Sequence, residues 1–168
     1  NYYIGSTVTI GNADSIDTFS VQGDGPSSIV MWASDSDLFT FQSDSSVGFL
    51  DMHSFTIASV ACNKSSTSTA IKFTGGVVKS SIGGLTLVGQ HSNIGTITTF
   101  LLGSCLDLGT VTDTVTVTDV LIWGHTGDGI KIGKGSEVRI AGGRIISFNK
   151  FDNSVGIHVT GNNGGWFT

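Results

Sequence analysis

Four aspartates between residues 107 and 128 are the side chains of this chain best suited to carry out a reaction. They are Asp107, Asp113, Asp119 and Asp128. Glycoside hydrolysis needs two carboxyl groups, about 5 Å apart for retention of configuration or about 6.5–9.5 Å apart for inversion. The group therefore predicts a hydrolytic site with these four acids as candidate catalytic residues. In the alternative interpretation, Asp113 and Asp128 are turn residues whose side chains bond nearby backbone N–H groups.

An aromatic ring and an imidazole lie just before the last of these acids, in Trp123-Gly-His-Thr-Gly-Asp128. Trp123 is suited to stack against a sugar ring, and His125 to make a polar contact or to exchange a proton. Lys131 follows as a third candidate substrate-binding residue. A polysaccharide lyase would instead need a basic residue as proton acceptor, and Lys131 or Arg139, close to Asp128 in sequence, is suited to that role.

A second pairing of acid and imidazole occurs in Asp51-Met52-His53, where the outer two residues share one face of a strand. The alternative is that His53 is an ordinary surface residue. The four histidines are His53, His91, His125 and His158. No two of them have a metal-ligand spacing such as H-x-x-x-H, so we expect no metal and no cofactor.

The elements that would position these residues follow from a short pattern that returns along the chain. Two apolar residues flank one that is not, which is typical of a strand with one buried face. The pattern occurs in residues 38–41, 69–74, 128–133 and 155–160. Taking the flanked residue as a marker gives Thr40, Lys72, Leu101, Lys131 and His158, in steps of 32, 29, 30 and 27 residues. This column is expected to point outward.

A strand motif that returns about every 30 residues predicts a solenoid. Two more columns support it. One contains residues 55–57, 85–87, 121–123 and 145–147, and the other contains residues 77–79, 115–117 and 138–140. Three short strands per coil, separated by polar turns, predict an all-β parallel β-helix in which each coil packs its apolar side chains on the next. The alternative is a β-sandwich, whose turns would follow every 8–12 residues without a longer period.

Composition supports strands and excludes some partners. The chain of 168 residues has 24 glycines, one glutamate, a net charge of −5 and only 12% charged residues. Its eight basic residues are scattered, so we expect no nucleic-acid binding, and its apolar runs are short and broken, so we expect no membrane insertion. The period does not stack Cys62 on Cys105, so two separate buried thiols are preferred to a disulfide.

Irregular stretches are expected where the pattern stops. Residues 61–69 and 89–99 are predicted to be polar loops, and residues 103–114 to lengthen one coil. Residues 3–10 already have strand character, and a new apolar pair begins at residue 166. We therefore expect a single domain over residues 1–168, cut from a longer chain with both ends uncapped or covered by partners.

The first repeats resemble a known family. Tyr3-Ile-Gly-Ser-Thr-Val-Thr-Ile10 and Val21-Gln-Gly-Asp-Gly-Pro-Ser-Ser-Ile-Val30 are similar to the entry of a pectate-lyase-like right-handed β-helix, as in bacteriophage tailspikes and some extracellular polysaccharidases. Asp128-Gly-Ile-Lys-Ile and Gly156-Ile-His-Val resemble coils from the middle of such a helix.

The resemblance implies a homotrimeric spike or fibre, located in a virion tail or outside the cell, that binds host surface polysaccharide. It also implies a polysaccharide depolymerase, for which a glycoside hydrolase is preferred to a lyase. The alternative is a structural fibre or adhesin without catalytic activity, in which the repeats hold the shape and present loops.

Overall fold

The computed structural model describes residues 1–11, 18–42, 47–89, 100–135, 137–146, 154–160 and 166–167. In this part of the chain the regular structure consists of strands and contains no helix, so it has no helix that could span a membrane. The strands form three sheets, and every pair of neighbouring strands is parallel. The predicted all-β class with parallel strands is confirmed.

Each time the chain passes through the three sheets, it adds one strand to each of them, except that sheet C twice receives two short strands. Sheet A has the order β1 (Tyr2–Ile4), β4 (Ile29–Trp32), β8 (Thr56–Ser59), β11 (Thr86–Gly89), β14 (Leu121–Trp123) and β18 (Arg144–Ile146). Sheet B has the order β2 (Val8–Ile10), β5 (Phe39–Phe41), β9 (Thr69–Phe73), β12 (Ser104–Asp107), β15 (Asp128–Ile132) and β19 (Val155–Val159). Sheet C has the order β3 (Phe19–Gln22), β7 (Leu50–His53), β10 (Gly76–Gly83), β13 (Val111–Thr118), β17 (Glu137–Ala141) and β20 (Trp166–Phe167), with β6 (Val47–Gly48) beside β10 and β16 (Lys134–Gly135) beside β13.

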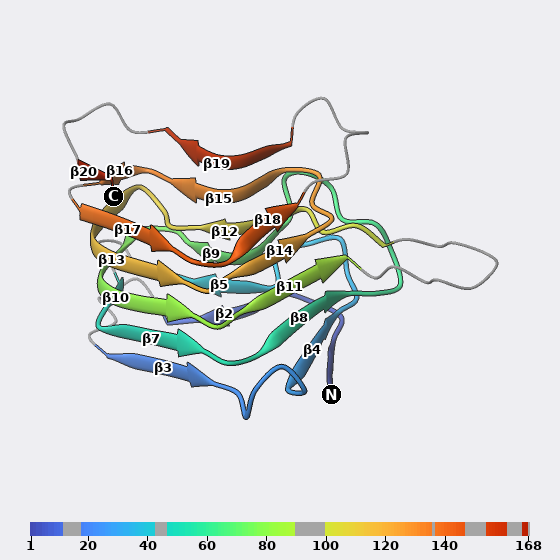
Figure 1. The fold of residues 1–168 in the computed structure, drawn as a ribbon. Helices are drawn as coiled ribbons and strands as arrows, with labels where there is room; N and C mark the ends of the chain where they lie inside the picture. The colour runs from blue at the N-terminus through green and yellow to red at the C-terminus, as the bar shows by residue number, and fades with distance from the viewer. Residues whose placement is uncertain are drawn as a thin grey trace.

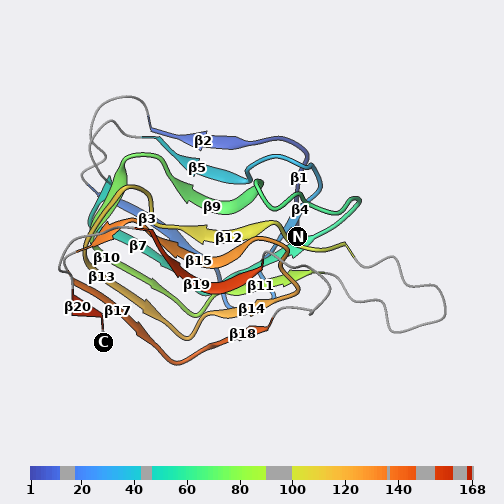
Figure 2. The same cartoon turned by 90° about the horizontal axis from the view of Figure 1, so that it is seen from above.

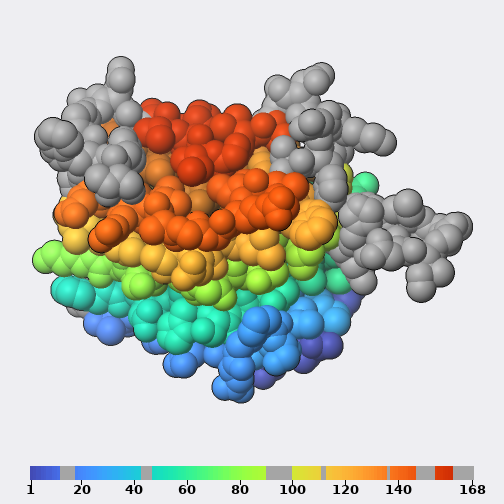
Figure 3. Space-filling view, viewed as in Figure 1, coloured from blue at the N-terminus to red at the C-terminus, as the bar shows by residue number. Residues whose placement is uncertain are grey.

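The chain visits the sheets in the same order throughout, first A, then B, then C. We call one such passage a circuit. Figure 1 shows successive circuits stacked from the blue N-terminal strands to the red C-terminal ones, and Figure 2 shows the six strands of sheet B side by side. The same order appears on the surface as successive bands of colour (Figure 3).

The core lies between the sheets and is built from columns of apolar side chains in register. In sheet B, Ile71 pairs with Leu106, which pairs with Ile130, and each is at most 1% exposed. A second column contains Phe41 and Phe73, whose rings stack with centroids 4.8 Å apart. Because each strand covers its neighbour with the same kind of side chain, the circuits stack without a change of register.

The predicted marker column is right at four of its five positions. Thr40, Lys72, Lys131 and His158 belong to one outward column of sheet B, but the residue between Lys72 and Lys131 is Asp107. Leu101 lies outside the strands and was the wrong choice. The steps are therefore 32, 35, 24 and 27 residues, because the fourth circuit carries its extra residues between β11 and β12.

For the same reason, residues 103–114 do not form a lengthened coil. They contain β12 and the start of β13. The second predicted column is confirmed in sheet A, where Ile57, Leu87, Ile122 and Ile145 are in register. In the third, the strands 115–117 and 138–140 pair as predicted, whereas Val115 faces Ser80 rather than one of residues 77–79.

The turns from sheet C to sheet A explain one of the four aspartates. Ser54, Gly84, Asp119 and Gly142 occupy the same position in four successive circuits, and all have positive φ, between 52° and 69°. The Asp119 N–H donates to the Ala141 carbonyl at 3.0 Å, and the matching N–H of Gly84 donates to Thr118. Asp119 therefore lies at a sharp left-handed turn, a conformation that glycine and short polar residues tolerate best.

Candidate functional site

The outward column of sheet B carries charges of both signs. Lys72, Asp107, Lys131 and His158 follow one another in register on β9, β12, β15 and β19. Side chains on this face alternate with the buried apolar ones, since successive residues of a strand point to opposite sides. Strand pairing alone therefore brings together four polar residues that are 24 to 35 residues apart in sequence.

Each acid on this face is paired with a base. Asp37 binds Lys72 at 2.8 Å, Asp107 binds Lys131 at 3.0 Å and Asp128 binds the Nδ1 atom of His158 at 3.0 Å. The carboxylates are the more buried partners, with side-chain exposures of 21%, 14% and 19%, against 36%, 38% and 46% for the bases. The bases are thus the groups that this face presents to solvent.

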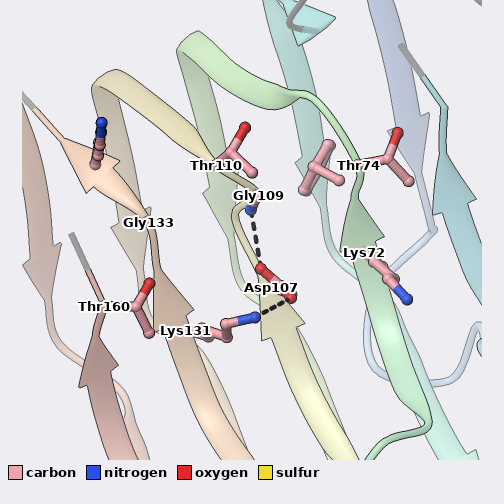
Figure 4. A pocket seen from close by; sticks show the side chains of 10 residues that line it. Lys72, Thr74, Asp107, Gly109, Thr110, Lys131, Gly133 and Thr160 are labelled. Carbon is pink, nitrogen blue, oxygen red and sulfur yellow. Dashed lines mark hydrogen bonds and ion pairs between the residues drawn. The ribbon is translucent and has the colours of Figure 1, made fainter. Parts of the chain in front are cut away.

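A groove of about 550 Å³ runs where sheet B turns toward sheet C. It is lined by Lys72, Phe73, Thr74, Asp107, Gly109, Thr110, Lys131, Gly133, Lys134 and Thr160. Figure 4 shows Lys131 reaching toward Asp107, whereas the amine of Lys72 points away from that carboxylate. Three lysines and one acid line the groove; Asp107 pairs with Lys131 and Asp37 pairs with Lys72, whereas Lys134 has no ion pair among the described residues. The excess of lysines favours a negatively charged ligand.

Backbone and hydroxyl groups form the rest of the groove. The second Asp107 oxygen, Oδ1, accepts the Gly109 N–H at 3.0 Å, which fixes the carboxylate that holds Lys131. Gly109 has φ +77°, and a Cβ on it would lie 2.6 Å from the Phe73 carbonyl oxygen. The Thr110 hydroxyl donates to the Gly75 carbonyl, and that of Thr160 to Ile132 at 3.2 Å. The floor of the groove is therefore formed by backbone segments that lie very close to one another.

The structure does not gather the four candidate aspartates at one place. Asp107 and Asp128 lie on sheet B in neighbouring circuits. Asp113 lies in β13 of sheet C, where it accepts a bond from the Thr114 hydroxyl at 3.2 Å, and Asp119 lies in the turn between sheets C and A. One pair of the four, Asp107 and Asp128, thus shares a face.

The three residues of the predicted sugar-binding run also separate. Trp123 is 39% exposed on the outer face of sheet A. His125 is fully buried; its Nδ1 bonds the Gly127 carbonyl at 2.8 Å, and its Nε2 has no hydrogen-bond partner within the described part of the chain. Only Lys131, the third predicted binding residue, reaches the groove, where it pairs with Asp107. A fully buried imidazole cannot touch a ligand on the surface.

The remaining candidates lie apart from the groove. Asp51 and His53 share the outer face of sheet C, as predicted, with Oδ2 and Nε2 3.5 Å apart. Arg139 is exposed on sheet C, whereas Asp128 lies on sheet B with His158 as its partner. His91 lies outside the described residues. Cys62 and Cys105 are both free thiols, the first partly exposed and the second buried.

Of the ten residues that line the groove, only Asp107 and Lys131 were predicted from the sequence to be site residues. Asp37 was not singled out, and Lys134, Thr74, Thr110 and Thr160 were not considered as ligand contacts, because they lie at strand ends where the alternating pattern stops. The correct register between the strands of sheet B would have identified these residues. With Asp107 in the marker column, residues 109–110 and 133–134 fall just beyond equivalent strand ends.

Comparison with known proteins gives no guide to the groove. Neither the family models, nor the curated proteins, nor the solved structures contain a match to this chain. Across the described ranges, no group of three His, Cys, Asp or Glu side chains is placed to hold a metal ion. The function is therefore argued from the chemistry of the groove.

Proposed function

We propose that this chain is a right-handed parallel β-helix that binds an acidic polysaccharide in the sheet-B groove. The fixed order of the three parallel sheets and the apolar columns in register support the β-helix, because stacked repeats of one unit bury a continuous core in this way. Connections between parallel strands are right-handed in nearly all proteins, which supports the hand. The resemblance of the first repeats to pectate-lyase-like helices points the same way.

The observation that carries the binding proposal is the distribution of lysines. The chain has six lysines and a net charge of −5, yet three of the six line this one groove. A chain that is acidic overall but concentrates its ammonium groups at one hollow attracts an anion there and repels it elsewhere. Carboxylate or sulfate groups spaced along a glycan are suitable partners for lysines spaced along a stack of strands.

The groove also suits the uncharged parts of a glycan. Thr74, Thr110 and Thr160 bring hydroxyl and methyl groups to the same hollow. Ligand sites that combine apolar surface with a few placed polar groups fix the orientation of a bound molecule. The groove crosses several circuits, so an extended chain of sugars is a better fit than a compact anion.

Cleavage of the bound polysaccharide is a second candidate function. Lys131 has Asp107 as its register neighbour on one side and His158, the partner of Asp128, on the other. A glycoside hydrolase needs two carboxyl groups that flank the bond, and these two acids share the face of sheet B. In this proposal Asp107 and Asp128 are the catalytic residues, and the protein is a depolymerase.

The resemblance extends the proposal to assembly and location. We infer a homotrimeric spike or fibre, in a virion tail or outside the cell. The outer face of sheet A supports subunit contact, because Met31, Ala58, Val88 and Trp123 form one apolar column there. A structural fibre without a ligand remains the competing proposal, and it makes the opposite prediction for the groove.

Binding is tested by titrating the protein with polygalacturonate, alginate and hyaluronate, with neutral dextran as the uncharged probe. We expect binding of at least one acidic glycan, weakened at least tenfold in Lys72→Met combined with Lys131→Met, and weakened by salt. Lys79→Met is the matched control, because Lys79 is an exposed lysine on sheet C, outside the groove. Retained folding of each variant is checked by circular dichroism.

The outcomes separate the proposals. Failure of every acidic glycan to bind, or an equal loss in the Lys79→Met control, would overturn binding in the groove and favour the structural fibre. Release of reducing ends that disappears in Asp107→Asn and in Asp128→Asn would establish cleavage. Binding without cleavage would leave the protein as an adhesin.

A further inference from the structure

Lys64 is buried between sheets A and B, away from the groove. It lies in the segment that joins β8 to β9, and only 2% of its surface is exposed. Its Nζ atom donates to the Val60 carbonyl at 3.1 Å, to the Cys62 carbonyl at 2.6 Å and to the Cys62 sulfur at 3.3 Å. These three acceptors use the three protons of an ammonium group. The segment was predicted to be a polar loop, but its lysine is part of the interior.

Among the described residues, no carboxylate lies within ion-pair distance of the buried ammonium, although Asp35 is close enough to attract it electrostatically. The four ion pairs found there involve other groups. Nζ lies 5.4 Å from the centre of the Trp32 ring, which offers a cation–π contact but no counter-charge. Buried charges are normally paired. Of the groups that bond Nζ, the Cys62 thiol alone can become negatively charged.

Cys62 differs from the other cysteine in ways that matter for oxidation. Cys62 is partly exposed and its thiol donates to the Ala33 carbonyl at 3.4 Å, so we expect a small oxidant to reach this residue. Cys105 is completely buried, and desolvation raises the pKa of its thiol far above the ordinary value. Because the thiolate is the reactive form, Cys105 is an inert internal control.

We propose that Cys62 and Lys64 form a redox cross-linking site, in which hydrogen peroxide creates a covalent bond between Sγ of Cys62 and Nζ of Lys64. The geometry is already that of a nucleophile beside its target, with the two atoms 3.3 Å apart. Segment 60–68 is also held in place on several sides. The Lys64 N–H donates to the Leu101 carbonyl at 3.0 Å, and the Thr126 hydroxyl bonds the Lys64 carbonyl at 3.4 Å.

The reaction has two steps. The Cys62 thiol takes one oxygen from hydrogen peroxide and becomes a sulfenic acid, and one water is released. Lys64 first loses a proton to solvent, and its amine then attacks the sulfenic sulfur; the S–N bond forms, the S–O bond breaks, and a second water leaves. The net change is the loss of two hydrogen atoms from the protein, and peroxide is reduced to two waters. A small thiol attacks the sulfur and restores the free amine.

Tryptic digestion reports whether the Lys64 amine is free or modified, because no lysine or arginine precedes Lys64 in the chain. Unmodified protein yields an N-terminal peptide that ends at Lys64. After peroxide treatment and unfolding without reductant, we expect that peptide to extend to Lys72 and to weigh about 2 Da less than the unmodified 1–72 sequence. Dithiothreitol should restore cleavage at Lys64.

Three controls make the experiment decisive. Cys62→Ser should abolish the longer peptide, and Cys105→Ser should leave it unchanged. Lys64→Arg keeps the positive charge but removes the amine, so Cys62 should then stop at sulfenic or sulfinic acid. Native protein whose Cys62 becomes sulfinic acid while trypsin still cleaves at Lys64 would overturn the proposal. The proposal would also be overturned if Cys62 stayed a free thiol under peroxide, or if the cross-link between Cys62 and Lys64 retained an oxygen atom.

Discussion

Sheets A and B show opposite chemistry on their outer faces, although their inner faces are alike. On the inner faces, Ile57 and Leu87 of sheet A fill the core in the same way as Ile71 and Leu106 of sheet B. Outside, sheet A carries an apolar column that includes Trp123, whereas sheet B carries the charged column and the groove. The inner residues must fit their neighbours above and below, and the outer ones need not. Function has therefore been free to vary only on the outer faces.

The largest expected effect separates the inner from the outer face of one strand. Ile71→Ala should lower the free energy of unfolding by about 2–5 kcal/mol, because it leaves a cavity in a fully buried column. Lys72→Ala, at the adjacent outward position, should change the free energy of unfolding by less than about 1 kcal/mol, since a partly exposed ion pair contributes little. Urea denaturation measures both. Equal losses would contradict the assignment of the two faces.

A smaller effect tests which outer face binds the glycan. Lys131→Met should weaken binding of an acidic glycan about tenfold, or about 1.4 kcal/mol. Trp123→Ala should leave that affinity unchanged, because Trp123 lies on sheet A and does not line the groove. Calorimetric titration measures the glycan affinity of both variants. A loss on Trp123→Ala alone would move the binding site to sheet A.

The Asp107→Asn variant distinguishes glycan binding from glycan cleavage at the sheet-B groove. Removing its charge frees Lys131 from its counter-ion, so affinity for an acidic glycan should rise about threefold by Coulomb attraction in a partly exposed site. If the protein is a hydrolase, the same variant should lose cleavage while it binds more tightly. The measurement is affinity and release of reducing ends on one preparation. Weaker binding would show that Asp107 itself contacts the ligand.

The turn at Asp119 gives a change in stability without a change in function. Asp119→Gly should raise the free energy of unfolding by up to about 1 kcal/mol, because glycine adopts the positive φ of 52° without strain. Binding and any cleavage should be unchanged if Asp119 is a turn residue. Thermal unfolding and the cleavage assay test this together. Loss of activity in a folded Asp119→Gly protein would restore the prediction that Asp119 is catalytic.

The smallest effect concerns the corner between sheets A and B. The Ser65 N–H and the Ser68 hydroxyl both donate to Asp35 at 2.7 Å, and these bonds hold the pKa of that carboxyl below its ordinary value. Asp35 therefore stabilises the fold at neutral pH, and this contribution is lost as the pH falls below about 4. Asp35→Asn should flatten that part of the curve of stability against pH. If the curve were unchanged in Asp35→Asn, Asp35 would not be the source of this pH dependence.

The sequence by itself determined the class of the fold and the positions of most strands. Alternating residues in segments such as 69–73 leave little choice of which side chains are buried, since a shift by one residue would expose every apolar one. The same reasoning placed Lys72, Lys131 and His158 on one outward column. It also selected Lys131 and Asp107 as candidates, though not as partners.

Only the tertiary structure decided the register between distant strands, and with it the site. Leu101 fits a period near 30 better than Asp107 does, with steps of 29 and 30 residues against 35 and 24, yet hydrogen bonding of β12 between β9 and β15 selects Asp107. The period fails there because extra residues between strands cost little when they leave the stacked strands intact. Local pattern specifies which face of a strand is buried. Pairing across 24 to 35 residues specifies which charges meet, and that information is not local.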